Sequence, residues 1–291
     1  MRVLQLLLIG LVSAGAATQD AAPPETFFDS AAVRIRYIDQ GQGSPVVFIH
    51  GYTGTLDRHF VNNGVAAALA KDHRVIAFDA RGHGKSGKPY DPSSYGPEMG
   101  RDVIRLLDHL RIPRAHIIGF SMGAIIAGHL LTTNPDRFIT ATFVAHHPVH
   151  SWTASDETEA EASARDLESG MPFRSLILGI WPKEKPPPST EEMRTLSQNL
   201  IAANDVKALA AYNRGRRALV VTPAQLAAVR VPTLAVVGTA DPNLDGVRNL
   251  PKVMPAVKIV VIDGAEHGGE RGILRRPEFI AALREFLRET R

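Results

Sequence analysis

The chain has 291 residues, a length that suits one large α/β domain or two small ones. Hydrophobic residues make up 44% and charged residues 22%, which excludes a disordered, collagen-like or multi-span membrane protein. The 33 basic residues are spread among 30 acidic ones, giving a formal net charge of +3, so the charge predicts no nucleic-acid partner.

The N-terminus has the pattern of a secretory signal peptide. Arg2 is followed by an apolar run from Val3 to Val12 and then by Ala14-Gly15-Ala16, which fits the small-x-small rule for cleavage. A membrane anchor is the alternative, but the run is about half of the roughly 20 residues that a spanning helix needs. We therefore expect residues 1–16 to be removed, leaving a secreted or periplasmic protein without a stable membrane span. The chain has no cysteine, so neither disulfides nor thiolate chemistry is expected there.

Short apolar runs alternate along the chain with longer helical patterns, and this alternation predicts a mostly parallel sheet flanked by helices. Most of the runs are continuously apolar, which is typical of strands buried on both faces. Spacings of three and four between apolar residues predict one helix over about 103–110 and another that begins after Pro277. The expected strands are 33–38, 46–49, 74–78, 116–118, 139–144, 234–237 and 258–262.

The alternation stops in a segment that is too long for a plain loop in a compact domain. An acidic, alanine-rich stretch runs from Asp156 to Glu168. Ser189 and Glu192 then have the spacing of a capping box, and a helix is expected from there to about Leu200. The basic cluster Arg214-Gly-Arg216-Arg217 is expected to lie in solvent. We interpret the segment as a helical insertion, with a linker as the alternative. The expected division is a core over 27–149 and 224–291 and an insertion over 150–223.

A serine stands between two glycines in Gly119-Phe120-Ser121-Met122-Gly123, where an apolar strand is expected to meet an apolar helix. This G-x-S-x-G pattern lifts the serine above the sheet on a strained turn, and glycines are needed where neighbouring backbone comes too close for a Cβ. The Met122 N–H, at the start of the helix, is then placed to donate to an oxyanion. An ordinary tight turn is the alternative, because a serine is a poor nucleophile without a histidine and an acid.

A histidine and an acid follow later in the chain, each in a loop after a predicted strand. His267 lies in a glycine-rich loop before the last helix, and Asp241 lies in the loop after the preceding strand. The carboxyl ends of parallel strands share one rim, where the Ser121 turn is also expected. Asp245 and Asp263 compete with Asp241 as the acid, but they are less well placed after their strands. The order serine, aspartate, histidine predicts a triad of Ser121, Asp241 and His267.

With this triad the chain resembles the α/β-hydrolase superfamily, and specifically its serine hydrolases related to esterases and lipases. The resemblance extends from about Phe27 to the C-terminus and places residues 150–223 where the family has a variable helical cap. Val47-Phe-Ile-His50-Gly51-Tyr52 resembles the family's strand followed by "HG". This implies that the Tyr52 backbone N–H completes the oxyanion hole with that of Met122, with Thr53 as an alternative, and that His50 supports the loop.

A second family motif follows the next strand. Asp79-Ala-Arg-Gly-His-Gly-Lys-Ser86 resembles the D-x-R-G-H-G-x-S turn of the superfamily. In the family this turn mainly shapes the fold, so the resemblance implies structural roles for His83 and Ser86.

The resemblance implies an α/β-hydrolase fold and a serine hydrolase that cleaves small or medium carboxylic esters through an acyl-enzyme, without a metal or cofactor. The nucleophile is serine and not aspartate, which argues against the haloalkane dehalogenase and epoxide hydrolase branches. Acyl transfer, perhydrolysis of the cofactor-free haloperoxidase kind and carbon–carbon bond cleavage use the same triad and stay open. A ligand-binding protein with little turnover is an alternative of another class. The expected partner is a small acyl substrate, and the oligomeric state is open.

Specificity is expected to come from the insertion, because in this architecture it roofs the rim where Ser121 emerges. Each apolar candidate for the lining is interpreted equally well as packing the cap onto the core. The candidate substrate-binding residues are Trp152, Phe173, Trp181 and Met193.

Overall fold

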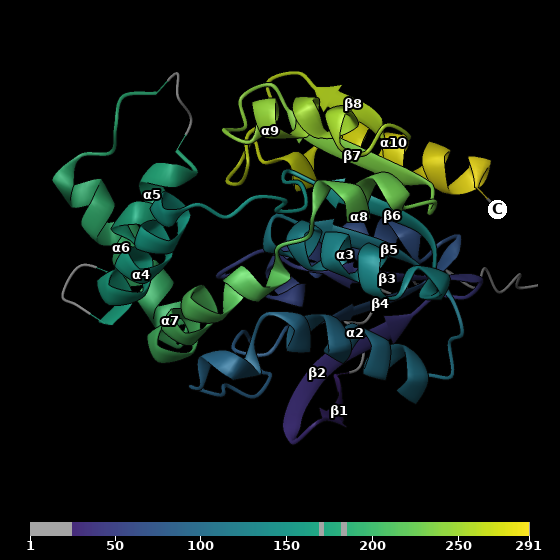
Figure 1. Ribbon diagram of the computed structural model, residues 1–291, viewed down its shortest axis with the longest axis horizontal. Coiled ribbons are helices and arrows are strands. Elements are labelled where there is room, and N and C mark those ends of the chain that lie inside the picture. The colour runs from purple at the N-terminus through teal and green to yellow at the C-terminus, as the bar shows by residue number, and fades with distance from the viewer. Residues whose placement is uncertain (1–24, 169–171, 182–184, 291) are drawn as a thin grey trace, which may run out of the picture.

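The computed structural model describes residues 25–168, 172–181 and 185–290 (Figure 1). The expected signal peptide, residues 1–16, lies outside the described residues. Within the described ranges, no helix combines the length and the apolar character that crossing a membrane requires.

An eight-stranded sheet runs through the centre of the described part of the chain. Its order is β1-β2-β4-β3-β5-β6-β7-β8, and β2 is antiparallel to both of its neighbours while the other neighbouring pairs are parallel. The seven predicted strands are all present, and the α/β fold with a mostly parallel sheet is confirmed. The strands are β1 (Thr26–Ser30), β2 (Val33–Gln40), β3 (Ser44–Ile49), β4 (His73–Phe78), β5 (Ala115–Phe120), β6 (Phe138–Val144), β7 (Thr233–Gly238) and β8 (Lys258–Ile262).

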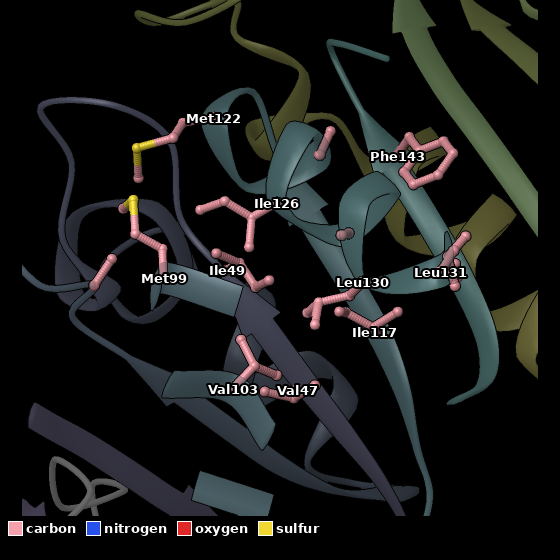
Figure 2. Packing of buried hydrophobic residues seen from close by; sticks show 14 of the residues in the cluster. Val47, Ile49, Met99, Val103, Ile117, Met122, Ile126, Leu130, Leu131 and Phe143 are labelled. Carbon is pink, nitrogen blue, oxygen red and sulfur yellow. The ribbon is translucent and has the colours of Figure 1, made fainter. Parts of the chain in front are cut away.

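Helices cover both faces of the sheet because side chains alternate along each central strand. Val47 and Ile49 of β3 pack into the cluster that contains Ile126 of α3 (Figure 2). Val46 and Phe48 of the same strand pack into the cluster on the opposite face. One cover is formed by α2 (Pro97–His109), α3 (Met122–Thr133), α8 (Pro223–Ala228) and α9 (Leu244–Asn249), the other by α1 (Val65–Leu69) and α10 (Pro277–Glu289).

Between β6 and α8 the chain leaves the sheet and forms a group of helices, which Figure 1 shows to one side of the sheet. A small apolar cluster joins these helices, with Leu167 and Leu209 buried in it. Ser189 and Glu192 form the predicted capping box, and the helix that follows runs to Ala203. The helices are α4 (Ala154–Glu168), α5 (Arg174–Gly179), α6 (Thr190–Ala203), α7 (Val206–Gly215) and the 3₁₀ helix η4 (Arg216–Leu219).

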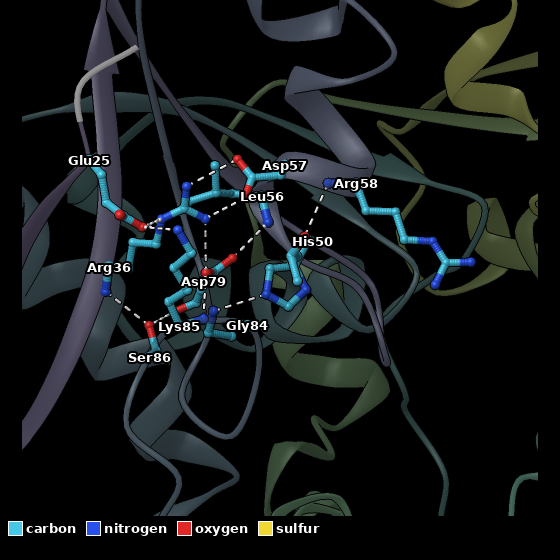
Figure 3. Close-up of polar contacts among 12 residues, drawn as sticks. Glu25, Arg36, His50, Leu56, Asp57, Arg58, Asp79, Gly84, Lys85 and Ser86 are labelled. Carbon is cyan, nitrogen blue, oxygen red and sulfur yellow. Dashed lines mark hydrogen bonds and ion pairs between the residues drawn. The ribbon is translucent and has the colours of Figure 1, made fainter. Parts of the chain in front are cut away.

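The turn after β4 is fixed by the buried carboxylate of Asp79 (Figure 3). Its Oδ1 accepts the Leu56 N–H at 2.8 Å, and its Oδ2 accepts the Lys85 N–H at 2.9 Å. Oδ2 also pairs with the Arg36 guanidinium at 3.2 Å. Ser86 Oγ donates to the Asp79 carbonyl at 2.6 Å and accepts the Arg36 N–H at 2.9 Å. Ser86 is therefore structural, as predicted, and the carboxylate ties the loop after β3 to this turn.

His83, in the same turn, is also buried. Its ring contacts that of His50, with the centroids 5.1 Å apart. Burial lowers the pKa of His83 to about 3, so the ring is neutral at physiological pH. This environment agrees with the structural role predicted for His83.

Candidate active site

Ser121 stands at the sharp turn between β5 and α3. Its backbone has φ 52° and ψ −113°, a strained combination for an L-residue that is found mostly at functional sites. A Cβ on Gly119 would lie 2.1 Å from the Gly123 carbonyl oxygen, and a Cβ on Gly123 would lie 2.1 Å from the Ile49 carbonyl oxygen. Close backbone approach therefore requires both glycines. The Ser121 N–H donates to the Val144 carbonyl at 2.9 Å, which ties the turn to β6.

The structure brings the three residues of the predicted triad together. His267 Nε2 lies 3.0 Å from Ser121 Oγ, and His267 Nδ1 lies 3.0 Å from Asp241 Oδ2. Asp241 follows β7 and His267 follows β8, so both loops lie at the carboxyl-end rim of the sheet with the serine turn. With its proton on Nδ1 facing the carboxylate, His267 presents the Nε2 lone pair to the serine hydroxyl. The side chains can therefore carry a proton from Ser121 to His267.

The two competing aspartates lie away from His267. Asp263 is exposed, and its Oδ1 accepts the Thr239 hydroxyl proton at 3.1 Å. Asp245 is exposed in the first turn of α9. The geometry thus selects Asp241 as the partner of His267.

Asn243 is a residue of this site that sequence reasoning missed. Its backbone N–H donates to Asp241 Oδ1 at 2.8 Å, and its side-chain Nδ2 donates to the Ala145 carbonyl at 3.1 Å. The same Nδ2 lies 3.4 Å from His267 Nδ1. Asn243 therefore fixes the acid loop against the end of β6. The sequence did contain a signal for this contact, because an aspartate side chain commonly accepts the backbone N–H of the residue two positions later.

His146 was also missed, because no motif marks the end of β6. It lines the same cavity as Ser121 and His267. Its Nδ1 accepts the His147 N–H at 2.9 Å, and burial lowers the pKa of His146 to about 4. The cavity wall beside the triad is therefore a neutral imidazole at neutral pH.

Two histidines hold the loop that would supply the oxyanion hole. His50 Nε2 accepts the Ala80 N–H at 2.9 Å, which leaves its Nδ1–H to donate to the Gly51 carbonyl at 2.8 Å. The Gly51 N–H in turn donates to His59 Nδ1 at 3.2 Å. Both backbone groups of Gly51 are thus bonded by imidazoles, and the next amide along the chain is that of Tyr52. Tyr52 lines the cavity together with Met122, the first residue of α3, as the predicted oxyanion residues should.

This arrangement requires His59 to be neutral, because a protonated Nδ1 cannot accept a hydrogen bond. Burial, with repulsion from His50, holds the pKa of His59 well below its ordinary value, and burial also lowers the pKa of His50. A histidine whose pKa is depressed in the folded state contributes stability above its unfolded pKa of about 6.5, and this is lost as the pH falls through the folded pKa. The loop should therefore hold its shape at neutral pH and lose it only in acid.

We expect His59→Phe to lower kcat with little change in KM. Phenylalanine keeps the ring that packs on Phe120, with centroids 4.9 Å apart, but it has no acceptor for the Gly51 N–H. The expected fall is roughly 10- to 100-fold, below the cost of deleting a whole oxyanion donor. Steady-state kinetics would measure it, with His109→Phe, remote from the cavity, as the control. A rise in KM at unchanged kcat would contradict the positioning role.

A cavity of about 220 Å³ opens above the triad. Ser121, Met122 and His267 line its floor, and residues of the helical insertion line the remainder. Of the four aromatic and apolar candidates in the insertion, Phe173 lines this cavity. The insertion thus covers Ser121, and the cavity is lined by residues of both the core and the insertion.

The other three candidates for substrate binding do not line this cavity, and their side chains make contacts within the insertion. Trp152 Nε1 donates to Glu157 at 2.7 Å, and Trp181 Nε1 donates to the Pro186 carbonyl at 2.9 Å. Met193 is buried in the apolar cluster of the insertion, against which Trp181 also packs. None of the three is among the residues that line the cavity in the described structure.

The basic cluster was predicted to lie in solvent, and this is correct only in part. Arg214 and Arg217 are at the surface, where they pair with carboxylates of α4. Arg216 instead lines the cavity above Ser121. Among the described residues, no cluster of three or more His, Asp or Glu side chains could hold a metal ion.

Comparison with known proteins places this site in a family. Residues 44–169 match the family model described as the alpha/beta hydrolase fold. The chain is 30% identical over 222 residues to the dihydrolipoyllysine-residue acetyltransferase component of the acetoin cleaving system of Cupriavidus necator, a match over 71% of this chain. The chain spans 58% of that relative's length.

Two further similarities extend over most of the chain. It is 29% identical over 207 residues to 3-oxoadipate enol-lactonase 1 of Acinetobacter baylyi, covering 70% of this chain and 74% of the relative. The crystal structure of the enol-lactonase from Burkholderia xenovorans superposes with a TM-score of 0.70 at 22% identity, covering 90% of this chain and 100% of that one. A structural match at this identity establishes the fold. The chain therefore belongs to the alpha/beta hydrolase fold family.

Proposed function

We propose that the protein is a serine hydrolase that cleaves small carboxylic esters through an acyl-enzyme on Ser121. The observation that carries the proposal is the pair of 3.0 Å contacts linking Ser121, His267 and Asp241 at the floor of a cavity. A serine, a base and an orienting acid in this arrangement are what acyl transfer from an ester requires.

In the first half-reaction, His267 Nε2 takes the proton of Ser121 as Oγ attacks the ester carbonyl carbon. The carbonyl oxygen becomes an oxyanion, to which the backbone N–H groups of Tyr52 and Met122 donate. Each such donor is typically worth about 3 kcal/mol in the transition state. The tetrahedral intermediate then expels the alcohol, which receives its proton from His267, and the acyl group remains on Ser121.

In the second half-reaction, water replaces the alcohol. His267 takes one proton of the water as the oxygen attacks the acyl carbon, and the second tetrahedral intermediate releases the acid while Ser121 recovers its proton. Asp241 holds the His267 tautomer and stabilises the imidazolium in both halves. Neutral His146 beside the triad adds no competing positive charge.

The volume of the cavity supports a small substrate. About 220 Å³ is below the roughly 300–1,000 Å³ usual for sites that hold drug-sized ligands. The two enol-lactonases are consistent with this proposal, because a lactone is a cyclic carboxylic ester. The name of the acetyltransferase relative favours acyl transfer to another acceptor as the second candidate, which uses the same first half-reaction.

A panel of esters tests the proposal. Acetate, butyrate and octanoate esters with one leaving group, together with a small lactone, would be assayed with the wild type and with Ser121→Ala as the blank. We expect the wild type to hydrolyse the short esters fastest and the blank to lose this turnover. Product analysis in the presence of alcohols would show transfer as new ester. Failure to cleave any ester or to transfer an acyl group would contradict the proposal.

A further inference from the structure

Arg216 is the first residue of η4 and differs from the two arginines beside it. Arg214 pairs with Glu161 at 3.0 Å and with Glu168 at 2.6 Å. Arg217 pairs with Glu157 at 3.1 Å. Arg216 forms no ion pair with any described residue, and its Nε is buried without a hydrogen-bond partner. It lines the cavity that also contains Ser121.

In the described structure the Arg216 guanidinium lies near an aromatic ring. Its Cζ lies 5.7 Å from the centre of the Trp152 ring, close enough for a weak cation–π attraction. Such a contact occupies one face of the guanidinium and leaves the N–H groups at its edge to donate. A half-buried cation with free N–H groups in a substrate cavity is a site for an anion.

Three residues that line the cavity together with Arg216 are neutral hydrogen-bond donors. Asn213 Nδ2 donates to Tyr52 Oη at 3.1 Å, which leaves the phenol proton of Tyr52 to donate elsewhere. Burial raises the pKa of Tyr52, and it raises the pKa of Tyr212 to about 12. Both phenols therefore stay protonated at neutral pH and can donate to an oxygen anion beside Arg216.

Two carboxylates, Glu159 and Asp166, line the cavity with Arg216, but in the described part of the chain neither forms an ion pair with it. Glu159 is exposed, and Asp166 accepts the Ser175 hydroxyl proton at 2.7 Å. The pKa of Asp156 is lowered chiefly by its hydrogen bonds from Thr153, with a smaller contribution from Arg216. Glu159 and Asp166 line the same cavity, so a bound anion would have to lie closer to Arg216 than to either carboxylate.

We propose that Arg216 binds a carboxylate of the substrate, so that the enzyme acts on small esters that carry a second, ionised acid group. This rests on the proposed function of Ser121 and specifies its substrate class. The carboxylate accepts two parallel N–H bonds from the guanidinium, which positions the scissile carbonyl over Ser121. The charged group can belong to the acyl chain or to the alcohol, and the test distinguishes them.

Matched substrate pairs test the proposal. Monomethyl succinate carries the charge on the acyl chain, and dimethyl succinate is its neutral counterpart. Acetoxyacetate and its methyl ester place the same difference on the alcohol side. We expect the wild type to prefer the charged member of at least one pair by roughly 10- to 100-fold in kcat/KM, the range for hydrogen bonds to a charged group.

The ratio of kcat/KM for the charged member of a pair to that for the neutral member should depend on Arg216 and not on the net charge of the protein. Arg216→Gln should lower it toward one, and Arg216→Lys should give an intermediate ratio because lysine keeps the charge without the planar fork. Arg217→Gln removes the same charge outside the cavity and should keep the wild-type ratio. A wild-type preference for the neutral members, or equal ratios in Arg216→Gln and Arg217→Gln, would overturn the proposal.

Failure of this inference can be separated from failure of the proposed function. If neutral esters are hydrolysed through Ser121 without a charge preference, only the anion subsite is wrong. If no ester is hydrolysed, calorimetric titration with glutarate, an unreactive dicarboxylate, tests the subsite alone. Binding by the wild type and by Arg217→Gln, lost in Arg216→Gln, supports it; absent or equal binding overturns it. Thermal unfolding of each variant would show that the fold is intact.

Discussion

Replacing Ser121 with alanine is expected to lower kcat for ester hydrolysis by a factor on the order of 10⁴ to 10⁶, as in other enzymes that depend on a serine, a histidine and an acid. Alanine removes the oxygen that lies 3.0 Å from His267 and leaves the remaining cavity unchanged. KM should change little, because the residues that surround the substrate stay in place. The strained backbone at this position accepts alanine as readily as serine, so the fold should persist.

The matched control for this variant is Ser155→Ala. Ser155 is exposed on the first turn of α4, outside the cavity. It should keep wild-type kinetics, and circular dichroism should give the same spectrum for both variants. Turnover by Ser121→Ala within tenfold of the wild type would contradict the nucleophile assignment.

Asp241→Asn is expected to lower kcat by about 10⁴-fold at neutral pH. The Asn243 N–H donates to Oδ1 of residue 241, so an amide there would direct its oxygen to that donor and its NH₂ group to His267. His267 Nδ1 would then have to accept, which places the ring proton on Nε2, facing Ser121. In that tautomer the imidazole cannot take the serine proton.

The two competing aspartates provide the controls for the acid. Asp263→Asn and Asp245→Asn make the same chemical change at exposed sites away from His267 and should keep kcat close to that of the wild type. Stopped-flow measurement of alcohol release would show whether acylation is the step affected. If kcat fell more in Asp263→Asn than in Asp241→Asn, the assignment of Asp241 as the acid of the triad would be contradicted.

The sheet could be predicted because most of its strands are buried on both faces and read as continuous apolar runs. β1 was not predicted. It pairs only with β2 at the edge of the sheet, and of its sequence TFFDS only Phe28 and Ser30 are buried. A short edge strand has little apolar surface to cover, so its sequence carries a weak signal.

The triad could be predicted because the backbone geometry of the serine turn requires the G-x-S-x-G pattern. Gly119 and Gly123 are required by close approach, and the rim of a parallel sheet fixes where the loops with Asp241 and His267 must lie. His59 gave no such signal. Its imidazole bonds Gly51 only because the chain folds back after β3, and this packing is not encoded in a local pattern.

The cavity wall was predicted less well than its floor, because it depends on which way each side chain of the insertion turns. Trp152, Trp181 and Met193 are apolar or aromatic, and packing uses such residues as readily as ligand binding does. Arg214 and Arg216 are almost adjacent in sequence but lie in different elements, α7 and η4, which send one to the surface and the other into the cavity.

The nucleophile itself can be identified by mass spectrometry of the protein after reaction with a fluorophosphonate. We expect a single adduct that peptide mapping assigns to Ser121. We also expect no adduct in Ser121→Ala and much slower labelling in His267→Gln, because His267 activates the hydroxyl. An adduct on another residue, or wild-type labelling of Ser121→Ala, would contradict the assignment of Ser121 as the catalytic nucleophile.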